Sequence, residues 1–373
     1  MDARALQADS LDELVEGLDE LLADDFRPTL AIVFVAVAHD LAELARVFAS
    51  REIELVGVTS SGEFVDDTVY EEAIVGLLLA ADRASYFTRL VDGAGKSSRE
   101  VGAALGRFAA ESCARPGLLV FSAGLKADGE QIVSGVLDAV DQGAPLFGGL
   151  AGDDLTLHRT SVALGESICH DGALALVFDQ ARVELRGVAS SGWQPIGASK
   201  TVTRAEGNLV FEIDGQPAID VYKTILHTTG SEGMMESELP LLVYRDDGSA
   251  VVRTAMMTDH ERGALVYAGT VRQGARVRFA SPPGFEITEH AVAEVKAFQE
   301  REAPAADAVL IASCKGRHLA LGPMVEDEIE ALHELWARPT VGFFSFGEIG
   351  RLTGSGTDFH NNTFSLVTIR ERE

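Results

Sequence analysis

The sequence has few basic residues, few cysteines and no long hydrophobic run. Its 31 Lys and Arg residues stand against 58 Asp and Glu residues, which leaves a net charge of −27. Sequence-independent binding to nucleic acid or to anionic lipid requires a surplus of cations, so we expect neither partner. The cysteines Cys113, Cys169 and Cys314 have no CxxC spacing and predict neither a disulfide framework nor a zinc knuckle.

The sequence also lacks the usual targeting signals. The longest apolar run, residues 30–38, is about half as long as a membrane span. The first residues are acidic and lack the apolar stretch of a signal peptide. The 46% hydrophobic content with 37 glycines is typical of a globular chain. We therefore expect a cytoplasmic protein that does not bind membranes.

Three segments have the pattern of a βαβ unit. The first joins a buried strand (30–37), a helix (40–49) and a second strand (53–59), and two similar units cover residues 117–149 and 307–346. Parallel strands of this kind are covered by helices. The sequence therefore predicts an α/β to α+β fold, with mixed β-sheets flanked by helices and duplicated βαβ-containing units packed into one body.

The first and third units end in the same pattern, which indicates internal duplication. Residues 57–64 (GVTSSGEF) and 342–349 (GFFSFGEI) both read G-x-x-S-x-G-E followed by an apolar residue. The second unit ends more loosely in FGGLAGDD, residues 147–154. A polar segment, residues 227–238, is interpreted as a mobile lid or a linker.

Ligands of parallel sheets bind at the carboxyl ends of the strands, where these patterns lie. Carboxylates together with one arginine suit a zwitterion, because a carboxylate can bind an ammonium group and the arginine a carboxylate. The alternative is that Glu63 and Glu348 cap helices or pair with buried arginines, and the sequence leaves both interpretations open. The predicted ligand-binding residues are Ser60, Ser61, Glu63, Gly148, Gly149, Asp153, Asp154, Cys314, Arg317, Ser345, Glu348 and Asn361.

Common catalytic motifs are missing. The segment 93–97 (GAGKS) lacks the first glycine of a phosphate-binding loop, and neither a G-x-S-x-G elbow nor an HExxH motif occurs. Cys314 is the one candidate nucleophile, because Lys315 and Arg317 could lower the pKa of its thiol. A cysteine hydrolase would also need a histidine such as His318 or His360. A small buried residue at a strand end remains the simpler interpretation of Cys314, so we expect no enzyme and no metal site. A cysteine- or carboxylate-dependent enzyme is the alternative.

Several motifs, in this order, resemble FIST sensory proteins. They are GVTSSGEF (57–64), APLFGGLAGDD (144–154), SGWQPIG (191–197), VTRAEGNLVFEIDGQPAIDVY (202–222), SCKGRH (313–318), GFFSFGEIG (342–350) and FHNNT (359–363). The resemblance implies a FIST N-terminal region (28–216) and a FIST C-terminal region (217–373) of a stand-alone protein. The residues before them predict an N-terminal amphipathic helix (1–27), because Ser10 and Glu13 form a capping box ahead of apolar residues at helical spacing.

The resemblance also implies a function in signal transduction, as a sensor of small ligands such as amino acids or their derivatives. Output is then expected to pass to a separate signalling protein, because the family regions take up almost the whole sequence. Some family members bind haem and sense nitric oxide, and eukaryotic relatives occur in ubiquitin signalling. We expect no cofactor here; in the haem alternative the axial ligand would be His158, His170, His227 or His360.

Overall fold

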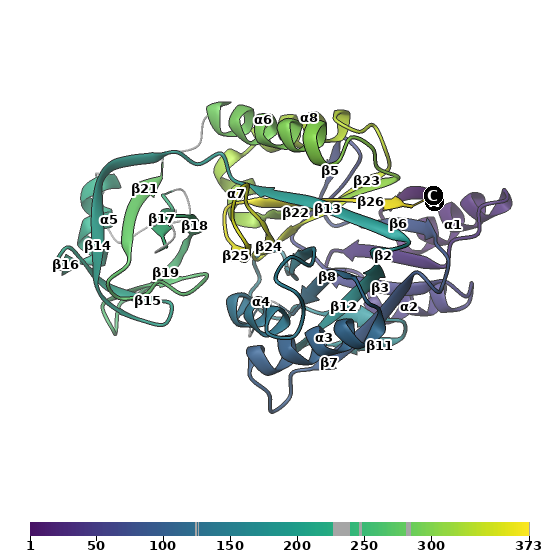
Figure 1. Cartoon of the computed structure of the whole chain (residues 1–373), viewed down its shortest axis with the longest axis horizontal. Helices are drawn as coiled ribbons and strands as arrows, with labels where there is room; N and C mark the ends of the chain where they lie inside the picture. Colours follow the sequence, from purple (N-terminus) through teal and green to yellow (C-terminus); the bar gives the residue numbers. More distant parts are fainter. Residues whose placement is uncertain (124, 126, 227–238, 246–247, 281–284, 373) are drawn as a thin grey trace.

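The computed structural model describes residues 1–123, 125, 127–226, 239–245, 248–280 and 285–372. It has a large body of three mixed β-sheets flanked by helices, and a smaller β-rich part formed by residues 195–280 (Figure 1). The α/β architecture expected from the sequence is therefore confirmed. No helix in the described ranges is long and apolar enough to cross a membrane.

The body repeats one order of elements three times along the chain. The first repeat comprises β1 (Asp2–Ala8), α1 (Leu11–Ala23), β2 (Leu30–Val35), α2 (Leu41–Ala49), β3 (Glu54–Thr59), β4 (Glu63–Val65), β5 (Thr68–Tyr70) and β6 (Ile74–Ala80). The second comprises β7 (Tyr86–Asp92), α3 (Ser98–Ser112), β8 (Pro116–Ser122), α4 (Gly129–Leu137), β9 (Leu146–Leu150), β10 (Val162–Leu164), β11 (Ser167–Cys169) and β12 (Gly172–Asp179). Strand β1 lies in the segment that the sequence assigns to an N-terminal helix.

The third repeat has the same order, with one long insertion and one additional helix, α7. It comprises β13 (Val183–Ser190), α6 (Phe285–Glu302), β22 (Ala308–Cys314), α7 (Lys315–Leu321), α8 (Met324–Glu334), β23 (Thr340–Ser345), β24 (Glu348–Arg351), β25 (Thr357–His360) and β26 (Phe364–Glu371). Local signals account for many of these bounds. For example, Ser97 and Glu100 form a capping box at the start of α3, so the segment 93–97 is a turn before a helix.

Each repeat contributes a β-hairpin to the sheet of another repeat. The sheet orders are β1-β6-β2-β3-β10-β11, β7-β12-β8-β9-β24-β25 and β13-β26-β22-β23-β4-β5. In each sheet the two parallel strands come from one repeat and the terminal hairpin from another. The exchange is cyclic, because the first repeat gives its hairpin to the third sheet, the third to the second, and the second to the first.

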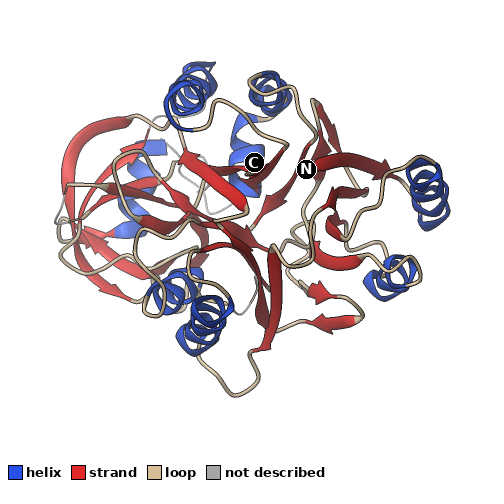
Figure 2. Cartoon of the chain, turned by 45° about the vertical axis from the view of Figure 1, so that its right-hand side comes forward, coloured by secondary structure: helices blue, strands red, loops and turns tan. Residues whose placement is uncertain are grey.

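The sheets pack against each other through aromatic side chains and are covered by helices outside. Phe34 of β2 stacks on Phe343 of β23 at 4.2 Å between ring centroids, and Phe121 of β8 contacts both rings edge-on. Figure 2 shows the helices in pairs at the periphery with the strands between them. One hydrophobic core thus joins all three repeats.

The insertion is a separate antiparallel sheet with one helix. It comprises β14 (Pro195–Glu206), β15 (Leu209–Ile213), β16 (Gln216–Pro217), α5 (Ala218–Leu226), β17 (Leu241–Tyr244), β18 (Ala250–Arg253), β19 (Ala255–Asp259), β20 (Ala264–Tyr267) and β21 (Arg276–Ala280). It has its own core around Tyr222 of α5. We call residues 195–280 the inserted domain. The segment interpreted as a lid, residues 227–238, lies outside the described residues.

Candidate functional site

The matching motifs of the first and third repeats make matching contacts. The Ser60 hydroxyl donates to the Glu63 carboxylate, and the backbone N–H of Ala73 donates to the same carboxylate at 3.0 Å. In the third repeat the Ser345 hydroxyl donates to Glu348 at 2.6 Å, and Thr363 donates to it through its hydroxyl at 2.7 Å. Each carboxylate is thus held by the segment that carries it.

Both carboxylates are fully buried, and their pKa values reflect that burial. Burial raises the pKa of Glu63 to about 7 and that of Glu348 to about 8, although the hydrogen bonds to both groups act in the opposite direction. No arginine forms an ion pair with either glutamate among the described residues. The structure thus fits neither alternative of the sequence analysis fully, because the partners of both glutamates are hydroxyl and backbone groups.

Most of the predicted site residues meet where the hairpins are exchanged. The turn after β3 contacts the end of β23, with the backbone N–H of Ser61 donating to the Phe344 carbonyl at 3.0 Å. The Ser61 hydroxyl accepts the backbone N–H groups of Asp153 and Asp154 at 3.1 and 2.9 Å. The three strand ends therefore form one connected region, as their common position at carboxyl ends of parallel strands predicts.

The glycines of the second repeat allow close strand contact. Gly148 pairs with Ile349, and Gly149 pairs with Glu348 in the exchanged hairpin. Gly148 has a φ of +137°, and a Cβ atom at that position would lie 1.9 Å from the Val120 carbonyl oxygen. Close packing therefore explains why both positions are occupied by glycine.

The aspartates of the second repeat do not take the place of Glu63 and Glu348. Glu63 lies opposite Phe343 and Glu348 opposite Gly149, and the residue in the matching position opposite Val58 is Val162. Asp153 instead accepts the backbone N–H groups of residues 157, 158 and 159 at 2.6–3.1 Å and holds the loop after β9.

That loop has a strained backbone. Asp154, Leu155 and Leu157 have φ values of +52°, +61° and +51°, a region that residues other than glycine rarely adopt. Strain of this kind persists where the surrounding contacts impose it, and it is frequent at functional sites. Here it keeps the side chains of Leu155 and Leu157 exposed, at 41% and 58%.

A cleft of about 230 Å³ lies between the inserted domain and the body, at the carboxyl ends of β22 and β23. Its lining combines apolar side chains with a small number of polar groups, as is usual for small-molecule sites. The lining residues are Leu155, Leu157, Thr254, Ala255, Met256, Ala268, Cys314, Lys315, Gly316, Leu319, Ser345, Phe346 and Asn361. Of the predicted site residues, Cys314, Ser345 and Asn361 line this cleft.

Two polar side chains in the cleft lack a hydrogen-bond partner among the described residues. Asn361 is 1% exposed, and neither its carbonyl oxygen nor its amide nitrogen is bonded. The hydroxyl of Thr254, which is 2% exposed, is also unbonded. Buried polar atoms are costly unless a partner satisfies them, so these groups indicate a place where a ligand or ordered water binds.

Cys314 lacks the features of a catalytic nucleophile. Burial and the nearby Glu348 raise the pKa of its thiol, which disfavours the thiolate. The His318 ring stacks on Phe344 at 4.1 Å, and burial next to Lys315 lowers the pKa of His318 to about 4. A neutral thiol and a neutral imidazole do not form an activated pair.

Arg317 does not face the cleft, contrary to its expected contact with a ligand carboxylate. Its guanidinium is completely buried and forms a two-pronged ion pair with Glu328 of α8, which is completely buried as well. It also donates to the Ser191 carbonyl at 2.5 Å. Because these bonds occupy the N–H donors of its guanidinium, Arg317 is not a candidate for ligand binding.

None of the described histidines named for a haem lines the cleft. His158 and His170 are exposed, and His170 is hydrogen-bonded to the Ser161 hydroxyl at 2.8 Å. His360 is fully buried, contacts the Gly350 carbonyl at 3.2 Å, and has its pKa lowered to about 3 by burial. His227 lies outside the described residues. The cleft therefore does not fit a haem bound through one of the described histidines, and the described residues contain no cluster that could hold a metal ion.

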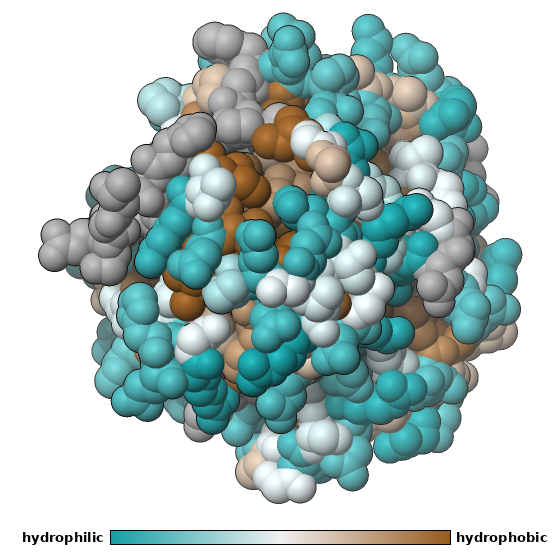
Figure 3. Space-filling model, turned by 90° about the vertical axis from the view of Figure 1, so that its left-hand side faces the viewer, coloured by the Kyte–Doolittle hydropathy of each residue, from teal (hydrophilic) through white to brown (hydrophobic). Residues whose placement is uncertain are grey.

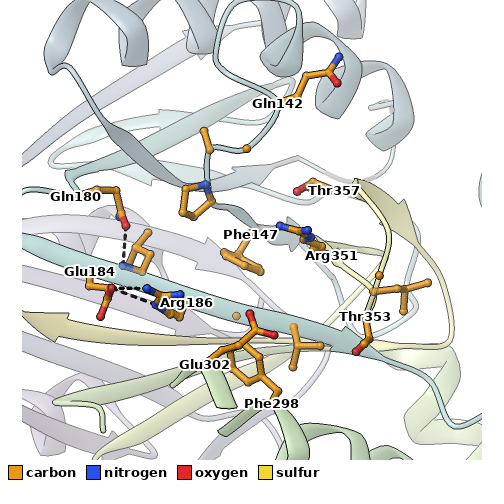
Figure 4. A pocket seen from close by; sticks show the side chains of 18 of the residues that line it. Gln142, Phe147, Gln180, Glu184, Arg186, Phe298, Glu302, Arg351, Thr353 and Thr357 are labelled. Atoms are coloured by element: carbon orange, nitrogen blue, oxygen red, sulfur yellow. Dashed lines mark hydrogen bonds and ion pairs between the residues drawn. The ribbon is translucent and has the colours of Figure 1, made fainter. Parts of the chain in front are cut away.

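A second cavity, of about 280 Å³, lies near the amino end of β9 (Figure 4). Several of its polar groups already have partners. Glu184 is paired with Arg186 and Arg372, and the side chain of Gln180 accepts a hydrogen bond from the backbone N–H of Leu185. None of its described lining residues has an unpartnered buried polar atom. It also lies at the end of the strands opposite to the one where ligands of parallel sheets bind.

The sequence analysis missed the other half of the cleft. Thr254 and Met256 come from the inserted domain, and nothing in the sequence shows that this domain packs near β22. Leu155 and Leu157 carried a weak signal, because they are apolar residues in a polar loop. Their exposure depends on the contacts of Asp153, which only the structure shows.

Comparisons with known proteins identify the family. Residues 29–216 match the FIST N domain, and residues 218–351 match the FIST C domain. An uncharacterized protein of Mycobacterium bovis is 25% identical over 195 residues, which is 49% of this chain and 50% of that protein. An uncharacterized protein of Mycobacterium tuberculosis is 25% identical over 197 residues, 48% of this chain and 49% of its own length. These matches therefore span about half of each curated relative. The chain belongs to the FIST family, whose domains are generally sensory domains of signal transduction.

Proposed function

We propose that this protein is a non-enzymatic sensor of the cytoplasm, which binds a small molecule in the cleft between the inserted domain and the body. The unpartnered Asn361 carboxamide, buried in a cleft with a largely apolar lining, is the observation that carries the proposal. An amino acid or one of its derivatives is a ligand of suitable size. The net charge of −27 argues against nucleic acid or a membrane as the target.

The contacts of the inserted domain support a route for the signal. Arg253 is 1% exposed, donates to the Phe359 carbonyl at 2.9 Å and pairs with Glu130 of α4 at 3.2 Å. Arg245 pairs with Asp358. A ligand that binds between the inserted domain and the body changes the stability of the interface between them. A separate signalling protein then binds one of the two resulting conformations preferentially.

The test is a thermal-shift screen of amino acids and related metabolites. A ligand that binds only the folded protein raises the apparent stability, by about 2.7 kcal/mol at a hundredfold excess over Kd. We expect at least one stabilising compound, and we expect Met256→Arg to abolish its effect, because Met256 lines the cleft.

Met257→Arg is the matched control. Met256 and Met257 are neighbours on β19 with 47% and 56% exposure, but Met257 does not line the cleft. The control should therefore bind as the unchanged protein does. A screen that yields no shift, or a ligand that is unaffected by Met256→Arg, contradicts the proposal.

A further inference from the structure

The volume and the side chains of the cleft suit a small apolar molecule. An engineered cavity of about 150 Å³ holds benzene, so 230 Å³ admits a somewhat larger compound, of the size of an amino-acid side chain with a short polar head. Among the described residues, seven large hydrophobic side chains are classed as exposed, and four of them line the cleft: Leu155, Leu157, Met256 and Leu319. Apolar surface gathered in this way marks a binding site.

These four side chains come from separate parts of the fold. Leu155 and Leu157 belong to the strained loop after β9, Met256 to the inserted domain, and Leu319 to α7. Figure 3 shows the face of the inserted domain, which is largely hydrophilic with hydrophobic side chains in its recesses. An apolar ligand would thus contact the body and the inserted domain at once.

The polar end of the cleft is cationic. Lys315 is the only charged side chain among the described lining residues. Its ammonium group contacts the His318 ring at 3.3 Å and has no carboxylate within ion-pair distance in the described part of the chain. Burial lowers the pKa of Lys315, and the nearby carboxylates of Asp154, Glu71 and Glu63 act against that shift. Lys315, the Asn361 carboxamide and the Thr254 hydroxyl can therefore bind an oxygen-rich head group.

A ligand ammonium group would find no carboxylate among the described residues that line the cleft. Glu63 and Glu348 do not line the cleft, and their oxygens already accept hydrogen bonds from Ser60, Ala73, Ser345 and Thr363. Asp154 does not line it either. An ammonium group would be desolvated next to Lys315, which is unfavourable.

We infer that the cleft selects a small apolar carboxylate without an ammonium group, such as the 2-oxo acid or an N-acyl derivative of an apolar amino acid. This inference rests on the proposed function and specifies its ligand. The carboxylate accepts hydrogen bonds from Lys315 and Asn361, and the apolar part packs on the leucines and Met256.

Calorimetric titration of the full chain with two matched probes tests this inference. Leucine and 4-methyl-2-oxopentanoate have the same number of heavy atoms and differ in the group at the α-carbon. We expect the 2-oxo acid to bind at least about tenfold more tightly than leucine, because the ammonium group of leucine would be desolvated beside Lys315. Lys315→Met should weaken the 2-oxo acid by about tenfold, and Thr254→Val, which is nearly isosteric, should weaken it less.

The controls separate this inference from the proposed function. Lys96→Met removes an exposed lysine in the turn before α3 and should leave the affinity unchanged. Equal or tighter binding of leucine, or an affinity that Lys315→Met does not change, overturns the ligand class. If neither probe binds, the class is also overturned, whereas the sensor function is decided by the screen with Met256→Arg.

Discussion

Glu63 and Glu348 illustrate how burial changes the chemistry of a residue. The same Ser-x-x-Glu contact occurs in two repeats, and in both the carboxylate is completely buried and forms no ion pair with a described residue. The neutral acid is the form that such an environment favours, which is why the pKa values rise to about 7 and about 8. The pair is therefore better suited to joining strand ends than to binding a ligand ammonium group.

We predict that Glu348→Gln makes stability less dependent on pH. The pKa of Glu348 rises from 4.5 to about 8 on folding, so its contribution is fully present below about pH 4.5 and is lost as the pH rises to about 8. Glutamine imitates the neutral acid and does not titrate. The variant should match the unchanged protein at pH 5 and exceed its free energy of unfolding by about 3 kcal/mol at pH 8.

Urea unfolding between pH 5 and pH 8 measures this difference. Glu63 also titrates, but it does so in both proteins, so its contribution cancels in the comparison. A difference that stays constant over this range would contradict the raised pKa of Glu348.

A second prediction concerns Arg317 and Glu328. Both side chains have 0% exposure, so Arg317→Met leaves the carboxylate of Glu328 buried without its partner. Loss of one member of a buried ion pair costs about 3–5 kcal/mol of stability. Replacing both residues by methionine should recover most of the loss, and urea unfolding of the four proteins of this double-mutant cycle checks it. A loss below about 1 kcal/mol for Arg317→Met would indicate a free, solvated arginine instead.

At the scale of elements, the exchanged hairpins determine which residues meet. Hairpin β4–β5 pairs with β23, so the motif of the first repeat lies beside the motif of the third. Hairpin β24–β25 pairs with β9 through Gly148 and Gly149. The glycines permit this pairing, because a side chain at Gly148 would collide with the backbone of β8.

We therefore predict that Gly148→Ala destabilises the fold by about 3 kcal/mol, through the positive φ and the collision with the Val120 carbonyl. Gly356→Ala is the control, because a Cβ atom there would have no neighbour within 4 Å and the backbone has no positive φ. The control should change stability by less than about 0.5 kcal/mol. Thermal unfolding of both variants measures the difference, and similar melting temperatures would contradict the prediction.

At the scale of the whole molecule, the body depends on all three repeats. The inserted domain, in contrast, is joined to the body by two chain segments that lie next to each other. Pro195 and Ala280, near its two ends, are paired in neighbouring strands, so the chain leaves and returns at adjacent points. The body core contains residues of all three repeats. The two parts should therefore respond differently to truncation.

Residues 1–215 alone should not fold cooperatively. They lack β26, which pairs with β13, and they lack the hairpin that completes the second sheet. Hairpin β4–β5 would also lose its partner strand β23. We expect a broad thermal transition and poorly dispersed NMR signals for this fragment, and a sharp transition would show that the exchange is dispensable.

Deletion of the inserted domain should leave the body folded. Paired strand residues lie about 5 Å apart, so a short Gly-Ser linker can replace residues 196–279. We expect a cooperative thermal transition for this variant and loss of ligand binding, since the deletion removes one wall of the cleft. An unfolded variant would show that the contacts of Arg253 with Glu130 and Phe359 are essential for the body.

The sequence by itself determined the local units of this protein. The buried strand Leu30–Val35, the helix Leu41–Ala49 and the capped start of α1 at Ser10 were predicted within one or two residues, because their signals lie in neighbouring residues. The importance of the two Ser-x-x-Glu motifs was visible for the same reason. Strand β1 was not predicted, since its short alternating pattern depends on pairing with β6.

Only the tertiary structure decided which of these units meet. The sequence could not show that Glu63 lies opposite Phe343 or that Glu328 pairs with Arg317. Nor could it show that Met256 and Asn361 line the same cleft. Such contacts join residues far apart in the chain, and they depend on strand register and on the space left by every other side chain. Local chemistry marked where functional groups gather, but burial and pairing in the folded protein determine which of them remain available to a ligand.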